Sequence, residues 1–245
     1  MKTIKILLIC MFAVVYVSAQ NVPPYTIAET EVNQPKFMAV KMANNTVENS
    51  LHNYIAQNFK YPTSEANHEG TEVVHFVIDA TGEVSNFTIV NSVSAKIDNE
   101  ILRVLESTDN MWIPGQTNGV PVAMEKEIAI KIVSSIASAN PAHKDFAEIA
   151  RTYYTKGSEK LLLEHKSKQA LRNFDKGIKY KPYDQSLLYL RGLCLYELGK
   201  TDEAHQDWAR VKKLGGYNMN DSYFAEDIKK LKGYHEIAAM LDLEE

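Results

Sequence analysis

The side chains that could carry out chemistry are few in this sequence and lie far apart. Seven histidines are scattered along the chain, and His235-Glu236 lacks the second histidine that a zinc-binding helix requires. His75 lies in a segment of alternating apolar residues, which favours an exposed position on a strand over a metal ligand. Cys194 lies in an apolar run, where a packed and unreactive thiol is expected.

No pattern typical of catalysis is present. The sequence contains no glycine-rich phosphate loop, no nucleophile elbow and no paired acid–base signature. Trp112 and Trp208 are interpreted as core residues rather than as platforms for a ligand. No basic stripe with interleaved aromatic residues occurs, which argues against a nucleic-acid partner. We therefore predict a protein that is not an enzyme and that uses neither a small-molecule cofactor nor a metal.

A β-hairpin is predicted over residues 70–90. Apolar side chains alternate along its first strand, as a half-buried strand requires, at Val74, Phe76 and Ile78. A polar turn at residues 79–82 supplies a glycine where the chain needs a positive φ. The apolar residues of the second strand change phase near Ser85, which indicates a β-bulge.

Two helices and a long strand complete this half of the chain. Residues 95–107 carry an apolar stripe at helical spacing, with Ser94 as the predicted N-cap. An earlier helix is predicted over residues 46–59. The last strand is predicted over residues 122–133, with isoleucines on one face and Glu127 and Lys131 on the other. The element order is therefore helix, strand, strand, helix, strand.

This order and a series of short motifs resemble the C-terminal domain of TonB, the periplasmic energy transducer of Gram-negative bacteria. The matching motifs are Tyr61-Pro62, Gly70, Phe76, Asp79, Gly82-Glu83-Val84, Asn91-Ser92, Ile97-Asp98, Trp112-Ile113-Pro114-Gly115 and Asn118-Gly119-Val120-Pro121-Val122. The resemblance covers residues 35–133. It departs from the family at Glu72, where a valine is usual, and at Lys126, which interrupts the apolar face of the last strand. The resemblance implies an α+β domain with a small antiparallel three-stranded sheet and two helices.

The first residues have the pattern of a secretory signal. Lys2 and Lys5 precede an apolar run over residues 6–17, and small residues at 17–19 form a cleavage site. The run is shorter than the roughly 20 residues of a membrane-spanning helix, which favours a cleaved signal over an anchor and predicts a periplasmic protein. An extended tether follows over residues 20–36. It reaches at most roughly 60 Å, whereas TonB crosses the periplasm on a longer linker from an uncleaved inner-membrane helix.

The second half is predicted to be helical. The domain after the tether is placed at residues 37–134, a linker at 135–141 and a helical domain at 142–245. Residues of like character recur at a spacing of 34, a period that resembles the tetratricopeptide repeat. The pairs are Ala170 and Ala204, Phe174 and Trp208, Tyr154 and Leu188, and Leu161 and Leu195. Gly157 matches Gly192 only if the intervening loop near His165 holds one extra residue, and otherwise Ser158 takes that place. A capping helix is predicted within residues 221–241, and an ordinary pair of helical hairpins is the alternative.

Charge is uneven between the two halves of the chain, and no intramolecular disulfide is expected despite the predicted export. Residues 20–141 carry 7 basic and 14 acidic side chains, a net charge of −7, while residues 142–245 carry 18 and 17, a net charge of +1. Removal of the signal leaves Cys194 as the single cysteine, so an intramolecular disulfide cannot form.

Two functions from different classes follow from these features. In the first, a TonB-like module binds an extended peptide of an outer-membrane transport receptor along its last strand. The predicted peptide-binding residues are Ala123, Glu125, Glu127, Ala129 and Lys131. The charges on this strand also fit a second interpretation, in which they protect an unused sheet edge. In the second function the protein is a periplasmic adaptor whose helical repeats recruit a partner protein, without energy transduction.

Overall fold

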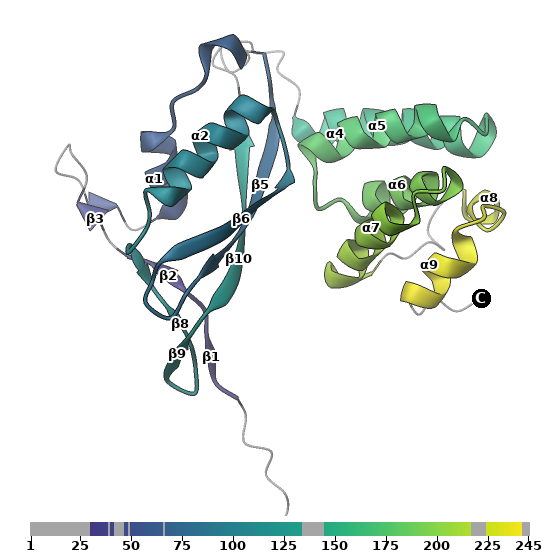
Figure 1. Ribbon diagram of the computed structural model, residues 1–245. Helices are drawn as coiled ribbons and strands as arrows, with labels where there is room; N and C mark the ends of the chain where they lie inside the picture. Colours follow the sequence, from purple (N-terminus) through teal and green to yellow (C-terminus); the bar gives the residue numbers. More distant parts are fainter. Residues whose placement is uncertain are drawn as a thin grey trace, which may run out of the picture.

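The structure is a computed structural model that describes residues 30–38, 40–41, 47–48, 50–65, 67–133, 145–216 and 224–241. It has an α+β half followed by a helical half, as predicted (Figure 1). The predicted signal at residues 1–19 and the predicted linker at residues 135–141 lie outside the described residues. No helix in the described part of the chain is long and apolar enough to cross a membrane.

The α+β half is built on a three-stranded antiparallel sheet. Its strands are β5 (Gly70–Ile78), β6 (Val84–Asn91) and β10 (Met124–Ile132), in the spatial order β10-β5-β6. The β5–β6 turn is fixed by the Asp79 carboxylate, which accepts hydrogen bonds from the Thr81 and Glu83 amides at 2.8 and 3.0 Å. The predicted bulge is confirmed, because the register shifts in this part of β6 and Asn86 has φ +54°.

Two helices cover one face of this sheet (Figure 1). They are α1 (Leu51–Asn58) and α2 (Ala95–Glu106), and Ser94 caps α2 as predicted, with its hydroxyl oxygen 3.4 Å from the Ile97 amide. The buried residues between helices and sheet form one core, made of Leu51, Tyr54, Ile55, Val74, Phe76, Ile78, Val93, Ile97, Ile101, Val104, Leu105, Trp112, Ile128 and Ile132. Trp112 is therefore a core residue, as predicted.

The first predicted helix is too long at its N-terminus. Helix α1 begins at Leu51, because the Ser50 hydroxyl accepts from the Asn53 amide and ends the helix there. Before it, β4 (Val47–Glu48) pairs with β3 (Val40–Lys41). A short 3₁₀ turn, Thr63–Glu65, follows α1.

The predicted tether also ends in paired strands. Strand β1 (Val32–Asn33) pairs with β8 (Gly115–Thr117), and β2 (Lys36–Phe37) pairs with β7 (Trp112–Ile113). Two further hydrogen bonds join Glu31 to Asn118, one from the Glu31 amide to the Asn118 side chain and one from the Asn118 amide to the Glu31 carbonyl. The residues before position 37 therefore belong in part to the folded domain.

The last predicted strand is divided in two. Residues 120–122 form β9 (Val120–Val122), which pairs with β8 in a hairpin around Asn118-Gly119, while β10 begins at Met124 and pairs with β5. The chain thus changes sheets at Ala123, which lies between the two strands. The alternation within β10 is as predicted, with Ile128 and Ile132 buried against the helices.

The described residues of the helical half form two antiparallel helix pairs followed by two short terminal helices, arranged as in Figure 1. The elements are α4 (Phe146–Ser158) with a π-helical turn (Glu159–Leu163), α5 (Ser167–Tyr180), α6 (Gln185–Glu197), α7 (Thr201–Lys213), α8 (Ala225–Ile228) and α9 (Tyr234–Leu241). The capping segment is therefore two helices rather than one. Residues 229–233 separate them.

The spacing of 34 residues corresponds to equivalent packing in the two helix pairs. A Cβ atom on Gly157 would lie 2.5 Å from the Phe174 ring, and one on Gly192 would lie 2.1 Å from the Trp208 ring. Each glycine thus lets the large ring of the following helix approach closely. Gly157 and Gly192 are 35 residues apart, and the extra residue falls where the π-helical turn forms an i→i+5 bond from the Glu164 amide to the Glu159 carbonyl.

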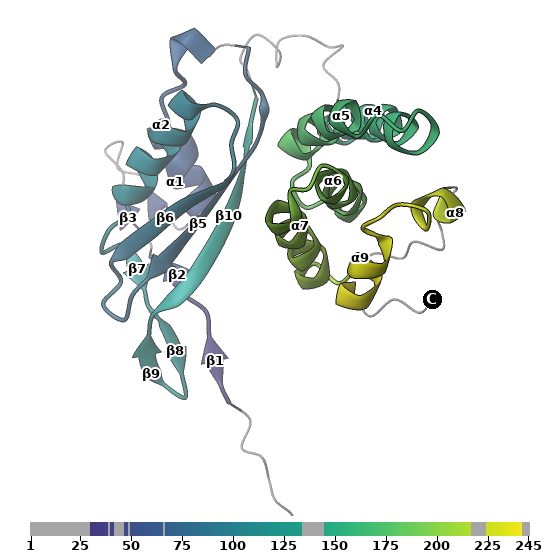
Figure 2. The ribbon, with the colours of Figure 1, turned by 45° about the vertical axis from the view of Figure 1, so that its right-hand side comes forward.

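The helical half packs against part of the other face of the sheet (Figure 2). The end of α5 contacts β5, where the Thr71 hydroxyl donates to the Tyr180 carbonyl at 2.8 Å. The Asn91 amide group of β6 lies 3.3 Å from the Lys179 carbonyl oxygen. Two side chains of the sheet thus satisfy carbonyl groups at the C-terminus of α5, which have no partner within the helix. Val73, which points to this face, is fully buried.

Candidate functional site: the outer edge of strand β10

Strand β10 is the edge of the central sheet for its whole length of nine residues. One side pairs with β5 from Met124↔Ile78 to Ile132↔Gly70, and within the described residues no strand pairs with the other side. An edge strand presents unpaired backbone N–H and C=O groups to which another chain can add. The unpaired edge of β10 therefore has the backbone groups that an extended peptide could bind.

Two contacts show which residues of β10 present their backbone groups outward. The Asn91 side chain of β6 donates to the Thr71 carbonyl at 2.6 Å, so odd-numbered residues of β5 face β6 and even-numbered residues face β10. On the outer side, Nε2 of His52 lies 3.3 Å from the Ala129 carbonyl oxygen. Because backbone groups alternate along a strand, the outward set is Glu125, Glu127, Ala129 and Lys131.

These are four of the five residues predicted from the sequence. The fifth, Ala123, lies before the strand and is not part of the β10 ladder. Sequence reasoning did not find His52, whose ring occupies part of the edge at Ala129. No local pattern around His52 could have indicated this contact, since 77 residues separate the two partners.

The side chains of this outward set lie on the face of the sheet that the helical half covers. The Glu127 carboxylate accepts a hydrogen bond from the Tyr183 hydroxyl at 2.9 Å and one from the Arg210 guanidinium at 3.0 Å. The guanidinium carbon of Arg210 also lies 5.1 Å from the centre of the Tyr183 ring. Burial and the bond to Glu127 raise the pKa of the Tyr183 hydroxyl, which therefore remains a donor at neutral pH.

The two remaining charged residues of the set are more exposed. The Glu125 side chain is 74% exposed and lies 3.3 Å from Nε2 of His75, whose own side chain is 25% exposed. The His75 side chain thus lies on the face of the sheet opposite the core between the sheet and its two helices, as predicted, but it is half-buried. Lys131 is exposed, and its ammonium lies 4.4 Å from the centre of the Phe146 ring at the start of α4.

Lys126 and Glu72, the two departures from the TonB pattern, both point toward the core side of the sheet. The Lys126 ammonium lies 5.8 Å from the centre of the Trp112 ring, which lets a charged residue remain on this face. Glu72 is fully buried, and one carboxylate oxygen accepts from the Val93 amide at 2.9 Å while the other has no hydrogen-bond partner among the described residues. Burial raises the pKa of Glu72 to about 8, and the neighbouring charge of Asp98 adds to this.

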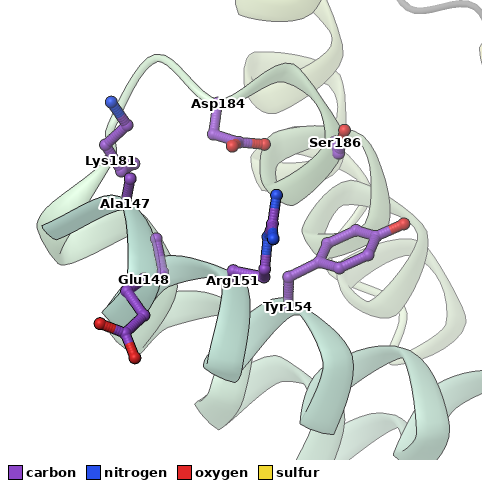
Figure 3. A pocket seen from close by; sticks show the side chains of 8 residues that line it. Ala147, Glu148, Arg151, Tyr154, Lys181, Asp184 and Ser186 are labelled. Carbon is purple, nitrogen blue, oxygen red and sulfur yellow. The ribbon is translucent and has the colours of Figure 1, made fainter. Parts of the chain in front are cut away.

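A second candidate site lies in the helical half, on the side away from α7. It is a groove of about 560 Å³ between α4 and the start of α6. Figure 3 shows Arg151 and Tyr154 projecting from α4 toward Asp184 and Ser186. The groove is lined by residues of α4, α6 and the connection before α6, and none of its lining residues belongs to the sheet.

Cys194 is not part of either site. It is fully buried among the helices, as predicted, and burial raises the pKa of its thiol. Trp208 is also fully buried, and its indole N–H lies 3.3 Å from the Tyr189 carbonyl oxygen. Both residues belong to the hydrophobic core of the helical half.

Comparison with known proteins finds a family match for part of the α+β half. Residues 57–132 match the family described as Gram-negative bacterial TonB protein C-terminal. This segment runs from the end of α1 to the last residue of β10, so it contains the whole central sheet and α2. It agrees with the resemblance found in the sequence. The helical half lies outside the match, and the chain has no significant match among curated proteins or among solved structures.

Proposed function

We propose that this protein is a periplasmic, TonB-like interaction module that binds an extended peptide of an outer-membrane transport receptor. The single observation that carries the proposal is the nine-residue outer edge of β10, within a segment that matches the TonB C-terminal family. Backbone hydrogen bonds to the edge supply affinity in this mode of binding, and alternate side chains supply specificity. The proposed role is binding rather than catalysis, without a cofactor.

The proposal is tested by a proline at Ala129. Its N–H points away from β5, so proline removes a donor of the edge without removing a hydrogen bond of the sheet. Ala129→Val is the matched control, because it keeps the donor and adds a β-branched side chain that strands accept. We expect peptides of candidate receptors to bind the wild type and Ala129→Val in calorimetry, and not to bind Ala129→Pro.

Circular dichroism and thermal melting check that each variant is folded. Absence of binding by the wild type, or equal binding by the folded proline variant, would refute strand addition at β10. The His52 contact gives an additional check, because a peptide that pairs with Ala129 competes with the imidazole for its carbonyl. Peptide binding is therefore expected to strengthen in His52→Ala.

A second candidate function is an adaptor in which the helical half recruits a partner protein. The observation that favours it is the open groove between α4 and α6. We propose that the two helix pairs are tetratricopeptide-like, on the basis of the 34-residue spacing and of the equivalent glycine–ring contacts at Gly157 and Gly192. The alternative is an unrelated arrangement of helical hairpins.

The two proposed functions predict that different variants will fail to bind the partner protein. Co-purification of a tagged full chain from envelope fractions is carried out with Ala129→Pro and with Arg151→Glu, which reverses a charge in the groove. Loss of the partner in the first variant alone supports strand addition. Loss in the second alone supports the adaptor function.

A further inference from the structure

The outer edge of β10 carries two exposed charges of opposite sign at its two ends. Glu125 and Lys131 are six residues apart, both belong to the outward set, and both side chains lie on the same face of the sheet. Between them, Glu127 already accepts hydrogen bonds from Tyr183 and Arg210. Its negative charge is therefore compensated within the chain, and Ala129 has no charge.

We propose that Glu125 and Lys131 select the charge pattern and the direction of the bound peptide, an inference that rests on the proposed function. The partner is an extended segment with an acidic side chain toward its N-terminus and a basic side chain six residues later. It adds antiparallel to β10, with the acidic residue opposite Lys131 and the basic residue opposite Glu125.

Antiparallel addition continues the arrangement of the sheet, in which β10, β5 and β6 all pair antiparallel. Antiparallel pairs are slightly more stable per residue than parallel pairs. Side chains directly opposite each other on neighbouring strands lie within contact distance, and opposite charges at such positions stabilise the pair while like charges destabilise it. A peptide of the reverse pattern in the same direction would place like charges together at both ends.

The contacts that Glu125 and Lys131 make within the chain do not prevent this role. The Glu125–His75 pair involves a carboxylate that is 74% exposed, and ion pairs at such exposure contribute little. Lys131 contacts the Phe146 ring from an exposed position, where a bound carboxylate can approach its ammonium from the solvent side. By contrast, a basic residue opposite Glu127 would meet Arg210, so the middle of the edge disfavours basic peptide side chains.

The test uses two nine-residue peptides of the same composition and the full chain without its first 19 residues. One peptide has glutamate at its second position and lysine at its eighth, and the other has these two residues exchanged. The remaining positions alternate threonine and valine. We expect the first peptide to bind the wild type about tenfold more tightly in calorimetry, from two favourable pairs against two unfavourable ones.

The charge-exchanged variant Glu125→Lys with Lys131→Glu keeps the net charge and is expected to prefer the second peptide by a similar factor. Equal affinity of both peptides for the wild type, or no reversal in the folded variant, would overturn the inference and leave strand addition intact. Tighter binding of the second peptide to the wild type would also overturn it, because the exchanged pattern matches parallel addition. Absence of binding by either peptide, and by receptor peptides, would instead refute the proposed function itself.

Discussion

Replacement of Glu72 by glutamine is expected to change how the stability of the α+β half depends on pH. Glu72 is fully buried on β5, with one carboxylate oxygen bonded to the Val93 amide and the other without a hydrogen-bond partner in the described part of the chain. Burial raises its pKa from 4.5 to about 8, and Asp98 acts in the same direction. The Val93 amide and the Lys179 ammonium act in the opposite direction but are weaker overall.

The direction of the effect follows from the raised pKa. The folded state holds the proton of Glu72 more tightly than the unfolded state. The contribution of Glu72 to the free energy of unfolding is therefore greatest below pH 4.5 and falls as pH rises toward 8. The slope reaches about 1.4 kcal/mol per pH unit. Between pH 5 and pH 7 the wild type should therefore lose about 2.5 kcal/mol from this residue. Glu72→Gln keeps the size of the side chain and cannot ionise, so it should not show this loss.

The assay takes advantage of the two tryptophans, of which Trp112 lies in the α+β half and Trp208 in the helical half. In a Trp208→Phe background, fluorescence during urea denaturation reports the α+β half alone. The free energies of unfolding with and without the Glu72→Gln substitution are compared at pH 5, 6, 7 and 8, so that all other titrating groups cancel. A constant difference across this range would refute the assignment of a buried, protonated carboxyl at Glu72.

Three further predictions concern packing, the contact between the halves and export. Ala204→Leu should lower the stability of the helical half by about 1–3 kcal/mol because Ala204 is fully buried in α7, whereas Ala209→Leu at an exposed position of the same helix should leave the melting temperature within about 1–2 °C. Gly70→Val should weaken the contact between the halves, because a Cβ there would lie 2.9 Å from the Lys179 carbonyl oxygen. It should also strain the start of β5, because Gly70 has φ +158° and the same Cβ would lie 3.1 Å from Val93. Small-angle scattering should then show a larger radius of gyration, and an unchanged radius would contradict the contact. The exported protein should begin near Gln20, and mass spectrometry that finds an intact N-terminus would contradict cleavage.

The elements that were predicted correctly are those whose residues carry a local period. The alternation of Val74, Phe76 and Ile78 indicated the buried face of β5, and the stripe of α2 indicated its buried side. The bulge near Ser85 was also predictable, because a single added residue reverses the phase of the alternation. In each case the pattern within a single segment was sufficient to predict its structure.

The errors occurred where a distant segment decides the local structure. Strands β1 and β2 have only two residues each and exist because β8 and β7 lie beside them. The break at Ala123 arises because β9 pairs with β8 whereas β10 pairs with β5. The strand propensities of the local residues do not indicate this change of partner. For the same reason the bonds of Tyr183 and Arg210 to Glu127 could not be found from the sequence, since 56 and 83 residues separate the partners.

The pairing of β1 and β2 has a mechanical consequence. A force applied through the residues that precede Glu31 reaches the domain first at Glu31 and β1, which are held by two hydrogen bonds to Asn118 and a two-residue ladder. It then reaches β2, which has a two-residue ladder. The β5–β10 ladder is nine residues long and lies further along the chain. Under tension the short ladders should rupture first, which lengthens the connection by several residues while the central sheet keeps its hydrogen bonds. In that case the edge where a peptide would bind would remain intact while the N-terminal strands detach.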